Sequence, residues 1–332
     1  MEKFCIIGVD LSKKKLDFCV MLDGQVVNEQ IVSNDVWAVM AFLKELKTEL
    51  GLENANLLVC AEHTGQYTYP LSCACKISDC KLWLENPSQI KFSSGVQRGK
   101  NDKVDARRIA LYACRFSDKL RVHKPLTEEI EQLKQLEAER SLYITDMGKY
   151  KAQLKDQKGF MPEKMYLQKA HRLEKVIKQL EASIQIVDQL IQETILSNQL
   201  LNRQMELLCS VEGVGKIVAT SMIIITQAFT CFDDPRKFNC YAGLAPFCYI
   251  SGSSQYSRNR VSHRADKHIK SLLHMAAIAV IRKKDSELKD YFIRKKEEGK
   301  NSMTVINAIR AKIVARMFAV IRNNQIYKYS LT

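Results

Sequence analysis

The middle of the chain constrains the fold most, because it can form little other than long helices. From Thr127 to Asn198 the sequence has few Gly or Pro residues and many Glu, Lys, Gln and Leu residues, which favour helix. Its apolar residues recur in alternating steps of four and three, the spacing of a coiled-coil seam: Leu173, Ile177, Leu180, Ile184, Val187 and Ile191.

A weaker seam precedes it, formed by Leu133, Leu136, Ile144, Met147 and Leu154. The break from Gly159 to Pro162 predicts that two helices fold back as a hairpin. A plain helical domain and an arm that spaces domains or joins subunits both remain open, since the seam is narrow and its flanks are charged.

The segment before this region has an α/β pattern. Apolar, β-branched runs predict strands, an Asp23-Gly24 pair predicts a hairpin turn, and Asn34 is expected to cap a helix ending near Leu50. The expected strands are 4–10, 16–22, 25–32, 56–62 and 81–85. Three strands in a meander, then a helix, then alternating strands and helices is the order of the ribonuclease H-like (RuvC-like) fold, although other α/β folds remain possible.

The last third returns to mixed composition. It holds a glycine turn from Gly213 to Lys216, an apolar helix, a Ser/Gly/Arg-rich loop from Ile250 to Arg264, and closing helices rich in Ala, Ile, Lys and Arg. We therefore expect an α/β domain at 1–126, a coiled-coil hairpin at 127–200 and an α-rich domain at 201–332.

The net charge of the chain narrows the range of possible functions. A formal net charge of +14 favours a polyanionic partner, either nucleic acid or an acidic membrane surface, and the clustering of basic residues favours nucleic acid. No segment is expected to cross a membrane, because the longest near-apolar run, Ile217 to Phe229, is too short. The 11 cysteines are scattered and odd in number, which predicts free thiols in a reducing cytoplasm.

Four acids stand where chemistry is expected. Asp10 and Glu62 end two predicted strands, and Asp102 and Asp105 share one face of a helix start. Each alone has a structural explanation as a cap or turn residue. Together they would repel by roughly 4 kcal/mol per pair at 4 Å, so bound cations are expected. Oxygen ligands suit magnesium or manganese, and paired ions of this kind catalyse phosphodiester cleavage.

Several motifs in order resemble those of RuvC-like "DEDD" transposases of the insertion-sequence one-ten family, relatives of the Piv DNA invertase. Gly8-Val9-Asp10-Leu11-Ser12-Lys13, Ala61-Glu62-His63-Thr64-Gly65 and Asp102-Lys103-Val104-Asp105-Ala106 are similar to the catalytic motifs. In the last third, Ser210-Val211-Glu212-Gly213-Val214-Gly215 is similar to the family's helix-hairpin-helix-like entry. Tyr241-Ala242-Gly243-Leu244-Ala245-Pro246, followed by Ser251-Gly252, is similar to its C-terminal signature, so the likeness spans nearly the whole chain.

The resemblance implies roles for particular residues. Asp10, Glu62, Asp102 and Asp105 would bind the metal, and Ser251 would be the nucleophile that forms a transient phosphoserine link to DNA. It also implies a structured guide RNA that pairs with donor and target DNA. Dimers would assemble into tetramers, in which the carboxylate site of one subunit meets the serine of another.

Taken by itself, Ser251 lies in what looks like a flexible turn. The basic residues that follow it could hold a phosphate or form a solvated face: Arg258, Arg260, Arg264, Lys267 and Lys270. The sequence departs from the family pattern at Ala265-Asp266, where Gly-Asn is usual, and at Lys270, where Arg is usual. Asp266 is thus an extra acid beside the basic residues.

Several features of the sequence have alternative interpretations. The turn at Gly213 lacks the residues of a Walker P-loop, so it is either a packing turn or a contact to a DNA phosphate. Three cysteines near His63 (Cys73, Cys75 and Cys80) fit no standard zinc motif. A water-hydrolysing junction resolvase or nuclease, a non-catalytic nucleic-acid-binding protein and a sugar-kinase-like enzyme are the alternatives to a transposase.

Overall fold

The computed structural model describes residues 5–51, 56–93, 101–247, 250–251, 255–256, 260–261 and 265–328. At residues 247, 250–251, 255–256 and 260 it describes the backbone alone. The chain divides into two compact units, Met1–Pro125 and Leu126–Thr332.

The first unit is built on a mixed five-stranded sheet with the order β3-β2-β1-β4-β5. The first three strands form an antiparallel meander, and the last two run parallel to β1. The strands are β1 (Cys5–Leu11), β2 (Lys15–Leu22), β3 (Gln25–Ser33), β4 (Leu57–Glu62) and β5 (Lys81–Glu85). All five predicted strands are present, and their order is the one expected for a ribonuclease H-like domain.

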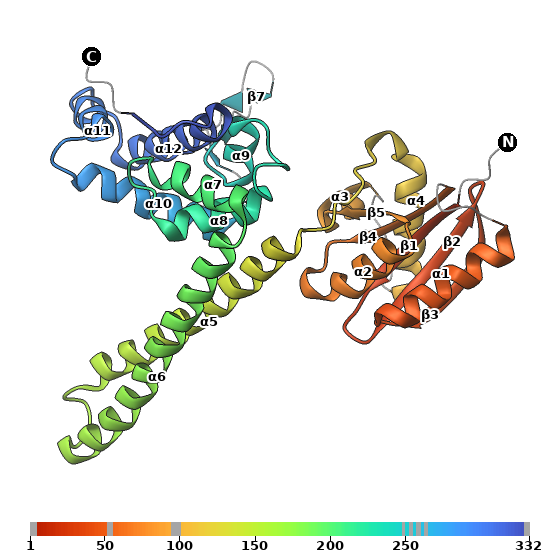
Figure 1. Ribbon diagram of the computed structural model, residues 1–332, viewed down its shortest axis with the longest axis horizontal. Coiled ribbons are helices and arrows are strands. Elements are labelled where there is room, and N and C mark those ends of the chain that lie inside the picture. Colours follow the sequence, from red (N-terminus) through yellow and green to blue (C-terminus); the bar gives the residue numbers. More distant parts are fainter. Residues whose placement is uncertain are drawn as a thin grey trace. The chain divides into compact units, whose positions relative to one another are not determined.

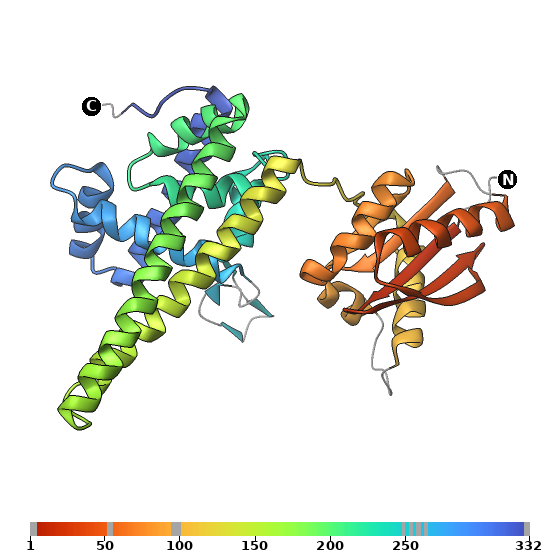
Figure 2. The same ribbon diagram turned by 60° about the horizontal axis from the view of Figure 1, so that its bottom comes forward.

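Helices cover both faces of this sheet (Figures 1 and 2). On one face, α1 (Val36–Leu50) and α2 (Tyr69–Ile77) pack on the apolar side chains of β1, β2 and β4. On the other face lie α3 (Pro87–Ser93) and α4 (Asp102–Arg115), with short 3-10 turns at Gly65–Thr68 and Ser117–Lys119.

The start of α1 corrects one prediction. Asp35, not Asn34, caps the helix, because its carboxylate accepts the backbone N–H groups of Trp37 and Ala38. Asn34 instead donates its amide to the carbonyls of Ser12 and Tyr67, and so ties the β1–β2 turn to the segment before α2.

A glycine brings α4 against the sheet. A Cβ on Gly8 of β1 would stand 2.3 Å from the Ala106 carbonyl oxygen and 2.3 Å from the Ala110 nitrogen. Only a residue without a side chain fits this contact of strand and helix backbones. Trp83 and Ile109 fill the same interface beside it.

The second unit begins with the predicted helical hairpin, α5 (Glu128–Gln157) and α6 (Glu163–Leu196), shown in Figure 1. The seam residues of α6 are buried or half-buried, as predicted. The upstream seam differs at Ile144, which is 38% exposed. Tyr143 and Arg140 take part in its place, and Arg140 Nε lies 2.6 Å from Asp188 Oδ1 of α6.

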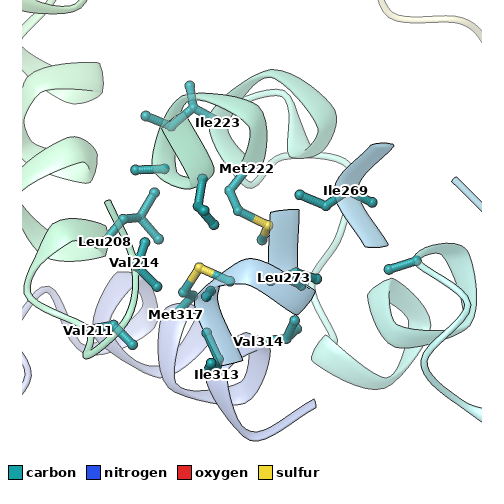
Figure 3. Close-up of a cluster of buried hydrophobic side chains, with 14 of the residues drawn as sticks. Leu208, Val211, Val214, Met222, Ile223, Ile269, Leu273, Ile313, Val314 and Met317 are labelled. Carbon is teal, nitrogen blue, oxygen red and sulfur yellow. The ribbon is translucent and has the colours of Figure 1, made fainter. Parts of the chain in front are cut away.

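The base of the hairpin shares one hydrophobic core with the C-terminal helices (Figure 3). Leu208, Met222, Leu273 and Met317, each from a different helix, meet there. The helices are α7 (Gln199–Cys209), α8 (Lys216–Thr226), α9 (Pro235–Tyr241), α10 (Lys267–Arg282), α11 (Glu287–Glu297) and α12 (Ser302–Asn323). The domain limits at residues 126 and 200 stay predictions.

Two short antiparallel strand pairs lie between α9 and α10. β6 (Pro246–Phe247) pairs with β9 (Arg260–Val261), and β7 (Ile250–Ser251) pairs with β8 (Gln255–Tyr256). Among the described residues, no helix has the length and apolar character that a membrane crossing requires.

The Gly8 contact predicts a large effect of one methyl group. Gly8→Ala should lower the free energy of unfolding by about 2–3 kcal/mol, because the added Cβ meets backbone atoms that cannot move aside. Gly148→Ala is the control: its Cβ meets nothing within 4 Å on α5, so stability should rise by about 0.5–1 kcal/mol. Urea unfolding of the full chain measures both. Equal stability of Gly8→Ala and wild type would contradict the close contact.

Candidate active site

A row of acids crosses the sheet at one end. Asp10 and Asp17 are directly opposite each other on β1 and β2, and Glu62 and Glu85 are paired on β4 and β5. Asp10 and Glu62 each follow the last paired residues of the parallel β1–β4 ladder, Val9 and Ala61. Four neighbouring strands therefore each contribute one carboxylate to the same edge.

The four carboxylates also point to the same face. Side chains alternate along a strand, and Ile6, Cys19, Cys60 and Trp83 pack under α4. Asp10, Asp17, Glu62 and Glu85 stand an even number of positions from them, so they share the α4 face. We call these four residues the acidic row.

The first turn of α4 adds the two remaining predicted acids. Asn101 caps the helix, so Asp102 is not the cap that its position alone allowed. Asp102 and Asp105 are both acids of the first turn, and Asp105 Oδ1 lies 2.6 Å from Arg108 Nη1.

Lys15 connects α4 to the acidic row. Its ammonium lies 2.9 Å from Asp102 Oδ2 and 3.0 Å from Asp17 Oδ2. The hydrogen bond to Asp102, followed by that to Asp17, raises the pKa of Lys15 above its usual range. Because Asp17 is opposite Asp10, this bridge places the first turn of α4 at the edge where the acidic row lies.

At the far end of the row Glu85 is half-buried and hydrogen-bonded to a tyrosine. Glu85 Oε2 accepts the Tyr112 hydroxyl at 3.1 Å, and burial, followed by this hydrogen bond, raises the pKa of Tyr112 to about 12. Burial, with the charges of Glu85 and Glu62, raises the pKa of the Cys60 thiol. A groove of about 1130 Å³ runs beside Glu85, and its lining includes Phe92, Phe116, Lys119 and Arg121.

The donor chemistry of this edge fits magnesium or manganese, since it offers carboxylate oxygens from neighbouring strands and a helix. In the part of the chain that the structure describes, however, no three His, Cys, Asp or Glu side chains stand close enough together to hold a metal ion. One reason is local: Asp102 is engaged with the Lys15 ammonium. The same finding covers His63 and the three nearby cysteines. Every described cysteine is free.

Sequence reasoning missed Asp17, Glu85 and Lys15. Asp17 is 3% exposed, which is rare for an acid. Its strand position opposite Asp10 was the one signal that could have identified it as part of the site. Glu85 ends its strand as Glu62 does. Lys15 gave no signal, because its partner Asp102 is distant in sequence.

The predicted nucleophile and basic residues belong to the second unit. Ser251 lies on β7, where the backbone alone is described, and Arg260 lies likewise on β9. Arg258 and Arg264 lie outside the described residues. Lys267 is exposed and Lys270 half-buried on α10. Asp266, which departs from the family pattern, caps α10 and accepts the Tyr241 hydroxyl at 3.0 Å.

The glycine turn proves to be a packing turn at Gly213. This residue has φ +84°, and a Cβ there would stand 2.3 Å from Val280 Cγ2 and 2.8 Å from the Ala276 carbonyl oxygen. Lys216 donates to Gln192 of α6 at 3.2 Å.

The mixed sheet, with carboxylates gathered at its strand ends, and the family matches below define the class of the protein, that of DNA-cleaving enzymes. Comparison with known proteins agrees. Residues 7–157 match the DEDD transposases of IS110, and residues 205–292 match the Transposase IS116/IS110/IS902 family. The chain belongs to the IS110 family of transposases, which are DNA-cleaving enzymes.

Two curated relatives are similar to this chain over nearly its whole length. The pilin gene-inverting proteins of Moraxella lacunata and Moraxella bovis are each 25% identical over 325 residues, covering 96% of this chain and 96% of theirs. Among solved structures, Thermus thermophilus RuvC is 13% identical and covers 35% of this chain and 96% of its own, with a TM-score of 0.28.

The Lys15 bridge can be tested by stability. Lys15→Met should lower the free energy of unfolding, because the Asp17 carboxylate stays buried without its ammonium partner. Lys14→Met, at an exposed neighbouring position, should change little. Adding Asp17→Asn to Lys15→Met should recover most of the loss in a double-mutant cycle followed by urea unfolding. A Lys15→Met variant as stable as Lys14→Met would contradict the bridge.

Proposed function

We propose that this transposase cuts and rejoins DNA with divalent metal held by Asp10, Glu62, Asp102 and Asp105, and with Ser251 as its nucleophile. The observation that carries the proposal is the meeting of the acidic row with the first turn of α4. Isolated structural acids have no reason to gather on adjacent strand ends, where their mutual repulsion costs roughly 3 kcal/mol per neighbouring pair.

Two groups of residues in the first unit would bind the metal. Asp10 and Glu62 project from adjacent strand ends and would hold the metal, while Asp102 and Asp105 would complete the site from α4. Asp102 must leave Lys15 to do so, and the freed ammonium stays beside Asp17. A bound magnesium or manganese ion supplies a Lewis acid that polarises the scissile phosphate.

Ser251 would act on the same phosphate. Its Oγ forms a bond to phosphorus while the bond from phosphorus to one deoxyribose oxygen breaks. The serine proton leaves to a carboxylate or water, and the departing oxygen receives a proton. The phosphoserine link preserves the phosphodiester bond energy, so rejoining needs no ATP. This role rests on the family signature around Tyr241–Pro246 and Ser251.

The proposed binding partners follow from the family resemblance and from the net charge of the chain. A net charge of +14 suits DNA and a structured guide RNA, with Arg258, Arg260, Arg264, Lys267 and Lys270 as phosphate contacts. A homodimer that assembles into a tetramer would bring the carboxylates of one subunit to the serine of another. DNA as substrate, together with the free cysteines, favours the cytoplasm.

Removing one acid tests the metal site. Asp10→Asn should reduce DNA strand cleavage by roughly a hundredfold or more, because a metal ligand and its charge are lost. Glu45→Gln, exposed on α1, should cleave normally. Titration with Mn²⁺, followed by electron paramagnetic resonance, should show weaker binding by Asp10→Asn alone. Undiminished cleavage by Asp10→Asn would contradict the role of Asp10 as a metal ligand. Unchanged nucleic-acid binding by Asp10→Asn, with no cleavage by either protein, would favour a non-catalytic nucleic-acid-binding protein.

Ser251→Ala distinguishes the transposase from a nuclease that hydrolyses with water. The variant should form no covalent protein–DNA adduct on denaturing gels and should still bind Mn²⁺. Ser271→Ala, exposed on α10, is the matched control and should form adduct at the wild-type level. Full cleavage by Ser251→Ala would show that water is the nucleophile.

A further inference from the structure

The second unit buries an arginine between two helices. Arg310 lies on α12, which packs against α10 (Figure 1), and it is 5% exposed. Its Nη2 donates to Nδ1 of His274 on α10. Its Nε is buried and has no hydrogen-bond acceptor among the described residues.

The pair carries one positive charge. Burial, followed by the Arg310 charge, lowers the pKa of His274, which favours the neutral imidazole whose Nδ1 can accept. Burial also lowers the pKa of Arg310, but a guanidinium keeps its proton at neutral pH. The seam between α10 and α12 therefore contains a buried cation.

No carboxylate in the described part of the chain compensates this charge. Within the described residues Arg310 forms no ion pair, and its single hydrogen-bond partner is His274. The undescribed stretches between α9 and α10 (248–249, 252–254, 257–259 and 262–264) contain no Asp or Glu in the sequence. A buried cation without an anion is costly, so proteins rarely keep one without a use.

The surroundings indicate where an anion would come from. One turn before Arg310, Asn307 donates its amide to the Leu244 carbonyl at 2.6 Å. One turn before His274, Lys270 is half-buried on the same face of α10. The segment from Leu244 to Asp266, which carries Ser251, is thus fixed to these two helices at its start and at its end.

We propose that Arg310, with His274 and Lys270, forms a binding site for a phosphodiester group of nucleic acid at the α10–α12 seam. The site rests on the proposed function, since it supplies a phosphate contact beside the segment that carries Ser251. Within the described residues, Nη2 of Arg310 is engaged by His274 and Nε is buried, so Nη1 is the nitrogen that a phosphate oxygen reaches first. DNA and RNA share this chemistry.

A binding arginine and a structural arginine respond differently to replacement by an apolar residue. If Arg310 exists for an anion, Arg310→Met removes an uncompensated buried charge, and the free protein becomes more stable. The same change weakens binding, because a charge-assisted hydrogen bond is lost. If Arg310 only holds α10 to α12, the variant loses stability and binds nucleic acid as tightly as its folded fraction allows.

The experiment compares full-length wild type, Arg310→Met, Arg310→Lys and the control Arg322→Met, an exposed position on the same helix. Thermal unfolding is measured with and without inorganic phosphate. Binding to single-stranded DNA, duplex DNA and RNA oligonucleotides is measured with EDTA over a range of salt, so that cleavage plays no part.

We expect Arg310→Met to unfold at a higher temperature than wild type and to lose the stabilisation that phosphate gives to wild type. Its binding should be about tenfold weaker, with a salt dependence reduced by about one phosphate contact. Arg310→Lys should retain part of both, and Arg322→Met should match wild type. The oligonucleotide that loses most affinity identifies DNA or RNA as the source of the phosphate.

Unchanged affinity and salt dependence in Arg310→Met would overturn the site, as would a lower unfolding temperature with unchanged phosphate stabilisation. If Arg310→Met does not fold, Arg310→Lys decides the question. Phosphate stabilisation of Arg310→Lys equal to that of wild type would then show that the charge is structural and would overturn the site. Failure of the proposed function is separate, because it shows as normal cleavage by Asp10→Asn.

Discussion

The contact between Gly8 and α4 is the constraint on which the acidic edge of the sheet depends. Two residues after Gly8, near the end of the strand, lies Asp10, and one residue before Ala106 the helix carries Asp105. Because the backbones meet at Gly8, the first turn of α4 must lie near the end of β1. Carboxylates that are distant in sequence are thereby brought to one edge without any direct bond between them.

The packing of α4 on the sheet concentrates negative charge, and basic side chains of the protein pair with these carboxylates. Lys15 serves Asp17 and Asp102 together, Arg108 serves Asp105, and Arg107 of α4 pairs with Glu29 on β3. Lys15 ties Asp102 to Asp17, so under the proposed function a metal ion at Asp102 would replace the Lys15 ammonium there.

Much of this architecture could be predicted from local pattern. Strands were readable from alternating apolar runs, and the hairpin from its seam and from the break at Gly159. The seam failed at Ile144, because Tyr143 and Arg140 face α6 and a pattern of apolar residues alone does not reveal an aromatic and a charged residue at such positions. Asp10 and Glu62 were visible because each ends a strand.

What could not be predicted depends on pairing between distant segments. Asp17 looks like an ordinary strand residue until the β1–β2 register places it opposite Asp10. Arg310 looks like one more basic residue on a basic helix until α10 buries it. The net charge of the chain does not distinguish Arg310 from the exposed Arg322, although only a buried charge has a large desolvation cost. In a chain with so many cations, burial without an acid is therefore a more selective sign of a phosphate contact than charge itself.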